Sequence, residues 1–340
     1  MWFSLNNRAR NNKFQPKTDC KYSPILLEFL HKYQINIKGD KFMEMSFGEA
    51  ERYIHSLFKI NHEVNIGNKT YKIIESGKPT TPQGEPKTDI YLLINDGSKD
   101  VELKISVKKD NADFLENKTS AERAFQIFGS DWMNIIINST LQIERNFLSK
   151  PLIYKTSQGK TEAGAITLGW KFELLNKMSG QLSEQIPLTK DQLIDIYAGT
   201  NLPPEKKNAY VNGRIISDSG IANTILFGDL TKFTNAESVL SSLQLIENYV
   251  NSHSNIYFAC KALNYRTFKS KYDGDRPLSV FVDWSVINSK LHPTLIFDKP
   301  LLTKGNEVAN KLMHALYQLG IRDTDDINEH NVSSLSYVHY

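Results

Sequence analysis

The spacing of apolar residues first becomes regular near residue 46. From Ser46 the sequence SFGEAERYIHSLFKI places apolar residues three or four positions apart, which is the period of a helix with one buried face. Ser46 and Glu49 have the spacing of a capping box, in which each side chain binds the backbone of the other residue. This segment predicts an amphipathic helix.

The period then shortens to two, which is typical of β-strands. Alternating segments run over residues 69–76, 88–96 and 100–109, and Asp96-Gly97-Ser98 lies between the last two. An Asp-Gly pair between alternating segments favours a tight hairpin turn. We therefore expect consecutive antiparallel strands directly after the helix.

The rest of the chain mixes both periods. Residues 119–148 predict one broken helix or two, interrupted near Gly129. Residues 151–250 have a weaker pattern with a turn at 202–204. The other predicted elements are helices at 188–199, 235–250 and 304–320 and strands at 255–268 and 276–287.

Composition indicates a globular chain. Of 340 residues, 40% are hydrophobic and 23% are charged, which is too apolar for a mainly disordered protein. No apolar run approaches the ~18 residues of a membrane span, and the N-terminal sequence lacks a signal-peptide pattern. We expect a cytoplasmic protein without a membrane partner. Cys20 and Cys260 are too few for a disulfide framework, so we expect reduced thiols.

The chemistry-bearing residues concentrate in the hairpin. Asp89 begins a predicted strand after the proline- and glycine-containing loop KPTTPQGEPK. On the next strand, alternation places one set of side chains on a single face and an apolar set on the other. The polar set is Glu102, Lys104, Ser106 and Lys108, and the apolar set is Val101, Leu103, Ile105 and Val107.

An acid at the head of one strand, with acids and lysines on its neighbour, suits phosphodiester hydrolysis. Mg²⁺ prefers oxygen ligands and keeps several waters, so two or three carboxylates are sufficient to hold it. The ion neutralises charge and lowers the pKa of an attacking water. A nearby lysine can orient that water and stabilise developing negative charge.

With these residues, the region from about Ser46 to Phe128 resembles the PD-(D/E)xK nuclease superfamily. Pro86 precedes Asp89 with Lys87 and Thr88 between them, a departure from the family's Pro-Asp dipeptide. The resemblance implies an α/β fold with a restriction-endonuclease-like core, a central mixed sheet flanked by helices. Asp89 would be the first motif acid, and Glu102-Leu103-Lys104 would complete the motif in one alignment.

A second alignment is preferred. Ser106-Val107-Lys108 resembles the Ser-x-Lys form found in restriction enzymes that cut sites with a CCGG core, where the missing carboxylate comes from the following helix. Glu122 lies 14 residues beyond Lys108 (122 − 108) in such a predicted helix. The resemblance also implies a further acid from the upstream helix, for which Glu49 and Glu51 are candidates, although Glu49 also has the position of a capping residue.

Basic and polar residues beside the hairpin and in the middle segment are candidates for DNA contact. Those expected to bind DNA are Lys109, Lys118, Arg123, Lys206, Lys207, Tyr210 and Arg214. The net charge of +3 neither requires nor excludes a nucleic-acid partner.

The resemblance implies a Mg²⁺-dependent, sequence-specific endonuclease of duplex DNA, of the type II restriction kind, acting as a homodimer. Residues 1–150 would hold the first part of the nuclease core with the catalytic hairpin, 151–250 a largely helical insertion or DNA-recognition region, and 251–340 the remaining core strands and a C-terminal helix. A structure-specific repair or junction nuclease and a non-catalytic DNA-binding module of the same fold are the alternatives. No P-loop, nucleophile-elbow or paired-histidine motif occurs, so we expect no nucleotide cofactor, serine hydrolase or zinc site.

Overall fold

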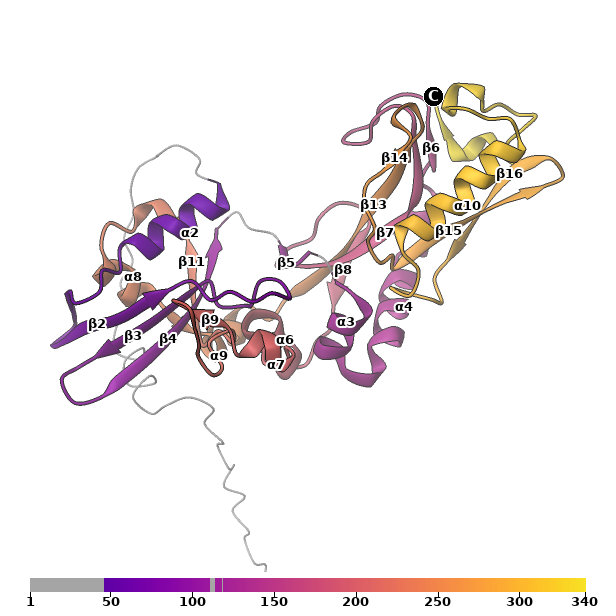
Figure 1. The fold of residues 1–340 in the computed structure, drawn as a ribbon. Helices are drawn as coiled ribbons and strands as arrows, with labels where there is room; N and C mark the ends of the chain where they lie inside the picture. Colours follow the sequence, from indigo (N-terminus) through magenta and orange to yellow (C-terminus); the bar gives the residue numbers. More distant parts are fainter. Residues whose placement is uncertain (1–45, 111–113, 118) are drawn as a thin grey trace, which may run out of the picture.

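The chain folds into two units that lie end to end (Figure 1). The computed structural model describes residues 46–110, 114–117 and 119–340. One unit, here called the first lobe, contains a six-stranded sheet with strand order β1-β2-β3-β4-β11-β12, and the second lobe contains a nine-stranded sheet. Buried apolar side chains form two separate clusters, one for each sheet. Each lobe therefore has its own core.

The first lobe begins with the predicted helix, α2 (Phe47–Ser56), and contains the three predicted strands, β2 (Lys69–Gly77), β3 (Ile90–Asn95) and β4 (Asp100–Lys109). A further strand, β1 (Glu63–Ile66), was not predicted and precedes β2. The capping box is confirmed, because the Ser46 side chain accepts from the backbone of Glu49 and the Glu49 carboxylate accepts from the backbone N–H of Ser46 at 2.8 Å. Gly97, with φ of 91°, makes the turn between β3 and β4, a backbone conformation that favours glycine.

The sheet of the first lobe is mixed because a distant segment completes it. Strand β11 (Thr224–Gly228) lies parallel to β4, and β12 (Gln244–Leu245) is antiparallel to β11. Helices α2 and α8 (Ala236–Ser242) pack their apolar residues, including Ile54 and Val239, against Leu103 and Leu226 of the sheet. This confirms an α/β arrangement with a mixed sheet.

Strand β11 also connects the two cores. Leu226 belongs to the cluster of the first lobe, whereas its neighbour Ile225 belongs to the cluster of the second lobe. That second cluster includes Ile196 of α6 (Lys190–Ala198) and Tyr249 of α9 (Ile246–Ser252). Alternation along one strand thus places successive side chains in different cores.

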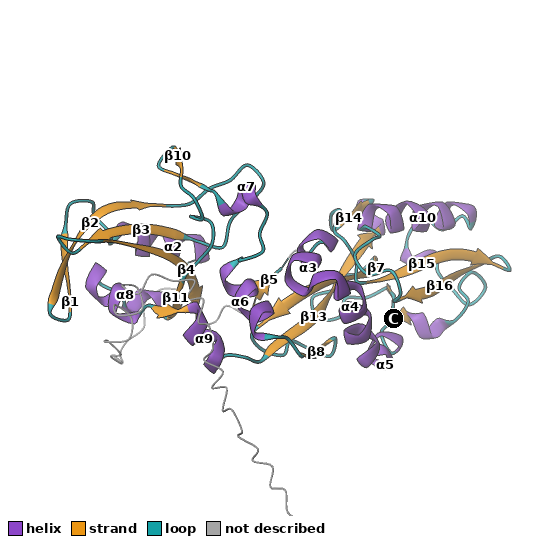
Figure 2. Cartoon of the chain, turned by 90° about the horizontal axis from the view of Figure 1, so that it is seen from below, coloured by secondary structure: helices purple, strands orange, loops and turns teal. Residues whose placement is uncertain are grey.

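The second lobe is a curled sheet covered by helices (Figure 2). Its central strand β7 (Ala165–Leu175) pairs with β13 (Ile256–Arg266) over most of its length. The other strands are β5 (Phe114–Glu116), β6 (Ile153–Tyr154), β8 (Ser183–Ile186), β14 (Lys271–Tyr272), β15 (Val280–Ile287), β16 (Lys290–Ile296) and β17 (Val338–His339). The helices are α3 (Ala121–Phe128), α4 (Trp132–Gln142), α5 (Glu144–Leu148), α6, α9 and α10 (Gly305–Gln318). The predicted helix break at Gly129 is confirmed.

The division of the chain differs from the one expected. Residues 151–250 are not largely helical, because they contain β7, which is buried on both faces and so lacks the alternation that marks a half-exposed strand. The strands of 251–340 lie in the second lobe and not beside the β3–β4 hairpin. The single helix expected over 235–250 is divided by β12, because that segment pairs with β11.

Three smaller expectations also have outcomes. The turn at 202–204 leads into a short helix, α7 (Pro204–Lys207). Cys260 is a buried free thiol, while Cys20 lies outside the described residues. Among the helices of the described ranges, none is both long and apolar enough to cross a membrane.

Leu103 tests the core of the first lobe. Its side chain is fully buried, so Leu103→Ala removes packed methylene groups and leaves a cavity, and we expect the free energy of unfolding to fall by about 2–5 kcal/mol. Urea unfolding followed by circular dichroism measures this loss. Ile74→Ala on β2 is the control, because Ile74 is 41% exposed and should cost less than about 1 kcal/mol. Equal losses in the two variants would contradict the packing described here.

Candidate functional site

Asp89 lies where β3 begins beside the end of β4. Ile90 pairs with Ile105, and the backbone N–H of Asp89 donates to the carbonyl oxygen of Ile105 at 2.9 Å. The Asp89 side chain then crosses to the neighbouring strand, where its Oδ2 accepts from the backbone N–H of Val107 at 2.7 Å. Main-chain and side-chain bonds together fix the carboxylate at this point of the sheet.

Of the site residues that the sequence predicts, Lys108 is the one whose charge acts most strongly on Asp89. It follows Val107 directly, and among the charged groups around Asp89 its charge has the largest effect on the pKa of that carboxyl. Ser106 is fully buried on the same strand, and its Oγ has no hydrogen-bond partner within the described part of the chain. The structure therefore brings Asp89 together with the Ser106-x-Lys108 end of β4.

The environment raises the pKa of Asp89 to about 6. Burial is the main cause, and the negative charge of Glu51 adds to it. Lys108, the Val107 N–H and Lys78 act in the opposite direction because each stabilises the ionised carboxylate. An acid that titrates close to neutral pH in a polar cluster is a frequent property of functional sites.

Glu51 is the upstream acid that the fold brings toward this cluster. It is 7% exposed on α2, and its Oε1 binds the Lys78 ammonium at 2.8 Å. Glu49, by contrast, is exposed and engaged with Ser46, whose hydrogen bonds lower the pKa of the Glu49 carboxyl. The helix thus orients Glu51 inward and uses Glu49 as a cap.

Lys78 and His55 belong to the same neighbourhood and were not singled out in the sequence. Burial lowers the pKa of His55, while Glu51 and a hydrogen bond to the Ser76 backbone oppose this effect. The signal for His55 was its position one helical turn after Glu51. Lys78 carried no comparable signal, because it follows β2 in a loop and reaches Glu51 only in the folded chain.

The alternative pair Glu102 and Lys104 does not join Asp89. Glu102 accepts from the Tyr91 hydroxyl at 2.6 Å, and Lys104 pairs with Tyr91 in the β3–β4 register. Glu102 pairs with Leu93, four residues beyond Asp89, which corresponds to ~13 Å along a strand. The structure therefore does not bring Glu102 to Asp89, which the Glu102-x-Lys104 alignment requires.

Glu122 and Arg123 lie on the first turn of α3 in the second lobe. Glu122 is exposed and accepts from the Gln126 amide at 3.5 Å. It is not among the groups with the largest effects on Asp89. Arg123 is engaged in ion pairs with Glu116 and Asp195 and is therefore not an exposed phosphate contact.

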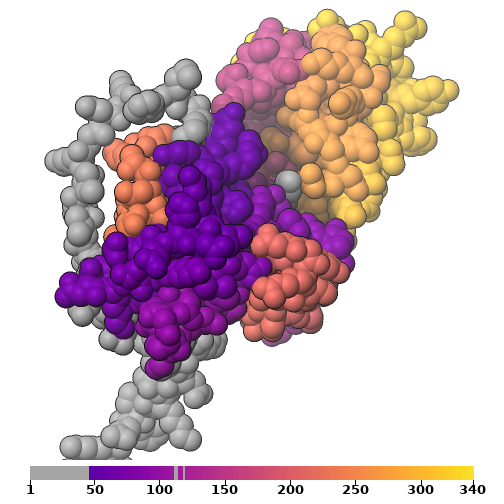
Figure 3. All heavy atoms as spheres, turned by 60° about the vertical axis from the view of Figure 1, so that its left-hand side comes forward, coloured from indigo at the N-terminus to yellow at the C-terminus, as the bar shows by residue number. Residues whose placement is uncertain are grey.

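The remaining predicted DNA contacts fall into two groups. Lys109 ends β4, whereas Lys118 lies outside the described residues. Lys206 and Lys207 lie on α7, and Tyr210 and Arg214 lie on the hairpin of β9 (Tyr210–Val211) and β10 (Arg214–Ile215). In Figure 3 this segment, in salmon, lies on the surface against the first lobe.

The β9–β10 hairpin is anchored to the first lobe, which carries Asp89. Tyr210 exchanges backbone hydrogen bonds with Thr80, the Asn212 amide donates to the Glu75 carboxylate at 3.2 Å, and Arg214 forms an ion pair with Glu75. Tyr210 itself remains 43% exposed. The anchoring places an exposed aromatic side chain next to the loop that leads to Asp89.

The donor chemistry of the cluster suits a hard cation. Asp89 and Glu51 offer carboxylate oxygens, the ligands that Mg²⁺ prefers, and an ion that keeps several waters needs no more than two such groups. Within residues 46–110, 114–117 and 119–340, no three His, Cys, Asp or Glu side chains gather closely enough to form a metal cage. Asp89 and Glu51 are thus the two acids that the described residues contribute to this cluster, and Glu51 is paired with Lys78.

Comparisons of the chain with protein-family models, with curated proteins and with solved structures gave no match.

The raised pKa of Asp89 predicts a pH-dependent effect of Asp89→Asn on stability. Because the folded-state pKa of about 6 lies above the ordinary aspartate value of 3.8, the carboxyl favours folding when protonated, and this contribution is lost as pH rises through about 6. Asp89→Asn should therefore be more stable than the parent at pH 7.5, with the difference shrinking toward pH 4. Urea unfolding in metal-free buffer across this range measures it. A difference that does not change with pH would contradict the raised pKa.

Proposed function

We propose that this protein is a Mg²⁺-dependent endonuclease of duplex DNA, of the PD-(D/E)xK type. The observation that supports the proposal is the convergence of Asp89 and Lys108 where β3 and β4 meet. The surrounding topology, an antiparallel hairpin with β11 parallel to β4 and a helix that presents Glu51, agrees with the fold that the resemblance implies.

Each residue has a role that follows from its chemistry. Asp89 and Glu51 would hold the cation, which when bound supplies Lewis acidity and lowers the pKa of a coordinated water. Lys108 carries a fixed positive charge beside Asp89, where it can orient the attacking water and stabilise negative charge on the phosphate. Lys78 neutralises Glu51 while no cation is bound.

Sequence specificity, restriction activity, a homodimeric state and a cytoplasmic location remain part of the proposal through the resemblance. The β9–β10 hairpin supports the first of these, because a two-stranded ribbon can enter the major groove of DNA. Exposed Tyr210 and the lysines of α7 are the groups on this segment that would contact bases and phosphates.

A second candidate is a non-catalytic DNA-binding module of the same fold. Ser106 stands where most members of the superfamily have an acid, and Glu51 already forms an ion pair with Lys78. A site with this composition could have retained DNA binding without cleavage. The distinction rests on whether Asp89 and Glu51 bind a cation.

Lys104→Met and Lys108→Met form a matched pair that tests the proposal. Both lysines lie on the same face of β4, but only Lys108 lies beside Asp89. We expect plasmid and phage DNA to be cut by the parent in Mg²⁺ and not in chelator. Lys108→Met should reduce the rate at least about 10²-fold, as for loss of one charge-stabilising donor, and Lys104→Met should stay within several-fold of the parent.

The other outcomes separate the alternatives. Equal losses in the two lysine variants would refute the role given to Lys108. Cleavage confined to branched or mismatched DNA would identify a structure-specific nuclease. DNA binding by an inactive parent, unchanged by Lys108→Met, would favour the non-catalytic module.

A further inference from the structure

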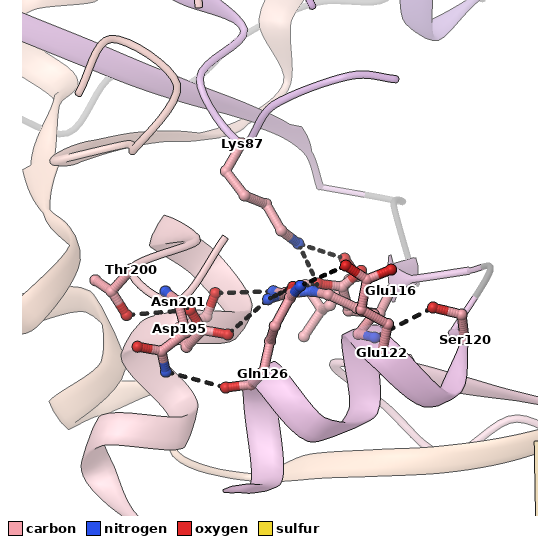
Figure 4. A network of polar contacts seen from close by, with 10 residues as sticks. Lys87, Glu116, Ser120, Glu122, Gln126, Asp195, Thr200 and Asn201 are labelled. Atoms are coloured by element: carbon pink, nitrogen blue, oxygen red, sulfur yellow. Dashed lines mark hydrogen bonds and ion pairs between the residues drawn. The ribbon is translucent and has the colours of Figure 1, made fainter. Parts of the chain in front are cut away.

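Lys87, two residues before Asp89, reaches from the first lobe into the second. Its ammonium Nζ lies 2.7 Å from Oε1 of Glu116 and donates to the carbonyl oxygen of Leu115 at 3.1 Å. Both partners lie on β5, which pairs with β7 of the second sheet. Figure 4 shows the Lys87 side chain pointing down toward Glu116. The segment that leads to Asp89 is thus held by the other lobe.

The contact continues as a buried network. Oε1 of Glu116 also accepts from Nε and Nη2 of Arg123 at 2.9 and 2.7 Å, and Nη1 of Arg123 binds Oδ2 of Asp195 at 2.8 Å. The side chains of Lys87, Glu116 and Arg123 are 14%, 14% and 12% exposed, and that of Asp195 is fully buried. Removing one member of such a network leaves a buried charge without its partner, so the arrangement is strongly fixed.

Asp195 is itself fixed within the second lobe. Its Oδ1 accepts from the Thr200 hydroxyl at 3.1 Å and from the backbone N–H of Asn201 at 2.5 Å. Because Asp195 lies on α6, the network is continuous from α6 through Arg123 and Glu116 to Lys87. The position of the Lys87 ammonium is therefore set by the core of the second lobe.

The backbone around Lys87 is shaped to admit this side chain. Gly199, at the end of α6, has φ of +76°, and a Cβ atom there would lie 2.7 Å from Cγ of Lys87. The backbone N–H groups of Lys87 and Thr88 both donate to the carbonyl oxygen of Gly220, at 3.0 and 3.3 Å. Contacts with Gly199 and Gly220 thus fix the backbone immediately before Asp89.

The network also ends close to the catalytic pair. Burial is the main cause that lowers the pKa of Lys87, and Glu116 opposes it. The positive charges of Arg123 and Lys108 lower the pKa of Lys87 further. Lys87 is therefore near enough to Lys108 to influence it, yet its ammonium is already bound by Glu116. This makes Lys87 a poor candidate for direct contact with a phosphate.

We propose that Lys87 is a positioning residue for Asp89, held by Glu116 so that the second lobe sets the geometry of the active site. The catalytic part of this inference rests on the proposed nuclease function. The structural part does not, because the hydrogen bond from Val107 to Asp89 reports the position of the carboxylate whether or not the protein cleaves DNA.

The experiment compares Lys87→Met, Lys87→Arg and Glu116→Gln with the parent and with Lys99→Met. Lys99 is exposed in the turn between β3 and β4, far along the chain of the hairpin from Asp89, and provides the matched control. Amide hydrogen exchange of Val107 is measured without metal, and DNA cleavage kinetics are measured with Mg²⁺. We expect exchange of Val107 to rise about 10-fold or more in Lys87→Met and Glu116→Gln, to return toward the parent in Lys87→Arg, and to stay unchanged in Lys99→Met.

For cleavage, a misplaced carboxylate should lower kcat by up to about 10²-fold, as expected for a displacement of about 1 Å, with KM for DNA unchanged. Lys87→Arg should recover part of kcat. A rise in KM with unchanged kcat would overturn the proposal by showing that Lys87 binds DNA directly.

The remaining outcomes also decide between the possibilities. Parent-like Val107 exchange in folded Lys87→Met would also overturn the proposal. If Lys87→Met does not fold, Glu116→Gln, which keeps the size of the side chain, carries the same comparison. If the parent cuts no DNA but Val107 exchange responds as expected, the proposed function fails while the positioning role stands.

Discussion

The hydrogen bond between the backbone N–H of Val107 and the Asp89 carboxylate is the contact on which the site depends. It is made where β3 and β4 meet, so the position of an acidic side chain is defined by the ladder of a sheet and not by a flexible loop. Strand alternation then gives Lys108 its place. The same constraint keeps the carboxylate partly buried, which is why its pKa is raised to about 6.

Charges of both signs surround Asp89. Glu51 comes from α2 with Lys78 as its counter-ion, and Lys108 comes from β4, whereas the Lys87 ammonium is bound by Glu116 of the second lobe. Helix α2 thus brings a second acid, Glu51, into the neighbourhood of Asp89, although β4 carries the uncharged Ser106 there.

Local patterns predicted elements of both lobes, including α6, α10, β13 and β15 of the second lobe, but they missed β7 and the presence of a second sheet. The capping box of α2 and the parity of β4 are short-range signals, and both appear in the structure. The choice between Glu49 and Glu51 needed the orientation of the helix relative to the sheet. The pairing of Lys87 with Glu116 and the central place of β7 depend on contacts between distant segments, which no local period encodes.

The long sequence separation between the paired strands β4 and β11 has a consequence for folding during synthesis. Strand β4 ends at Lys109, but its parallel neighbour begins only at Thr224, after much of the second lobe has been translated. Until then a long hydrogen-bonding edge of β4 is open on the nascent chain. Chains of this length fold through intermediates during synthesis, and an open edge invites pairing with other strands. Pairing of β4 with β11 must therefore wait until Thr224–Gly228 have been synthesised.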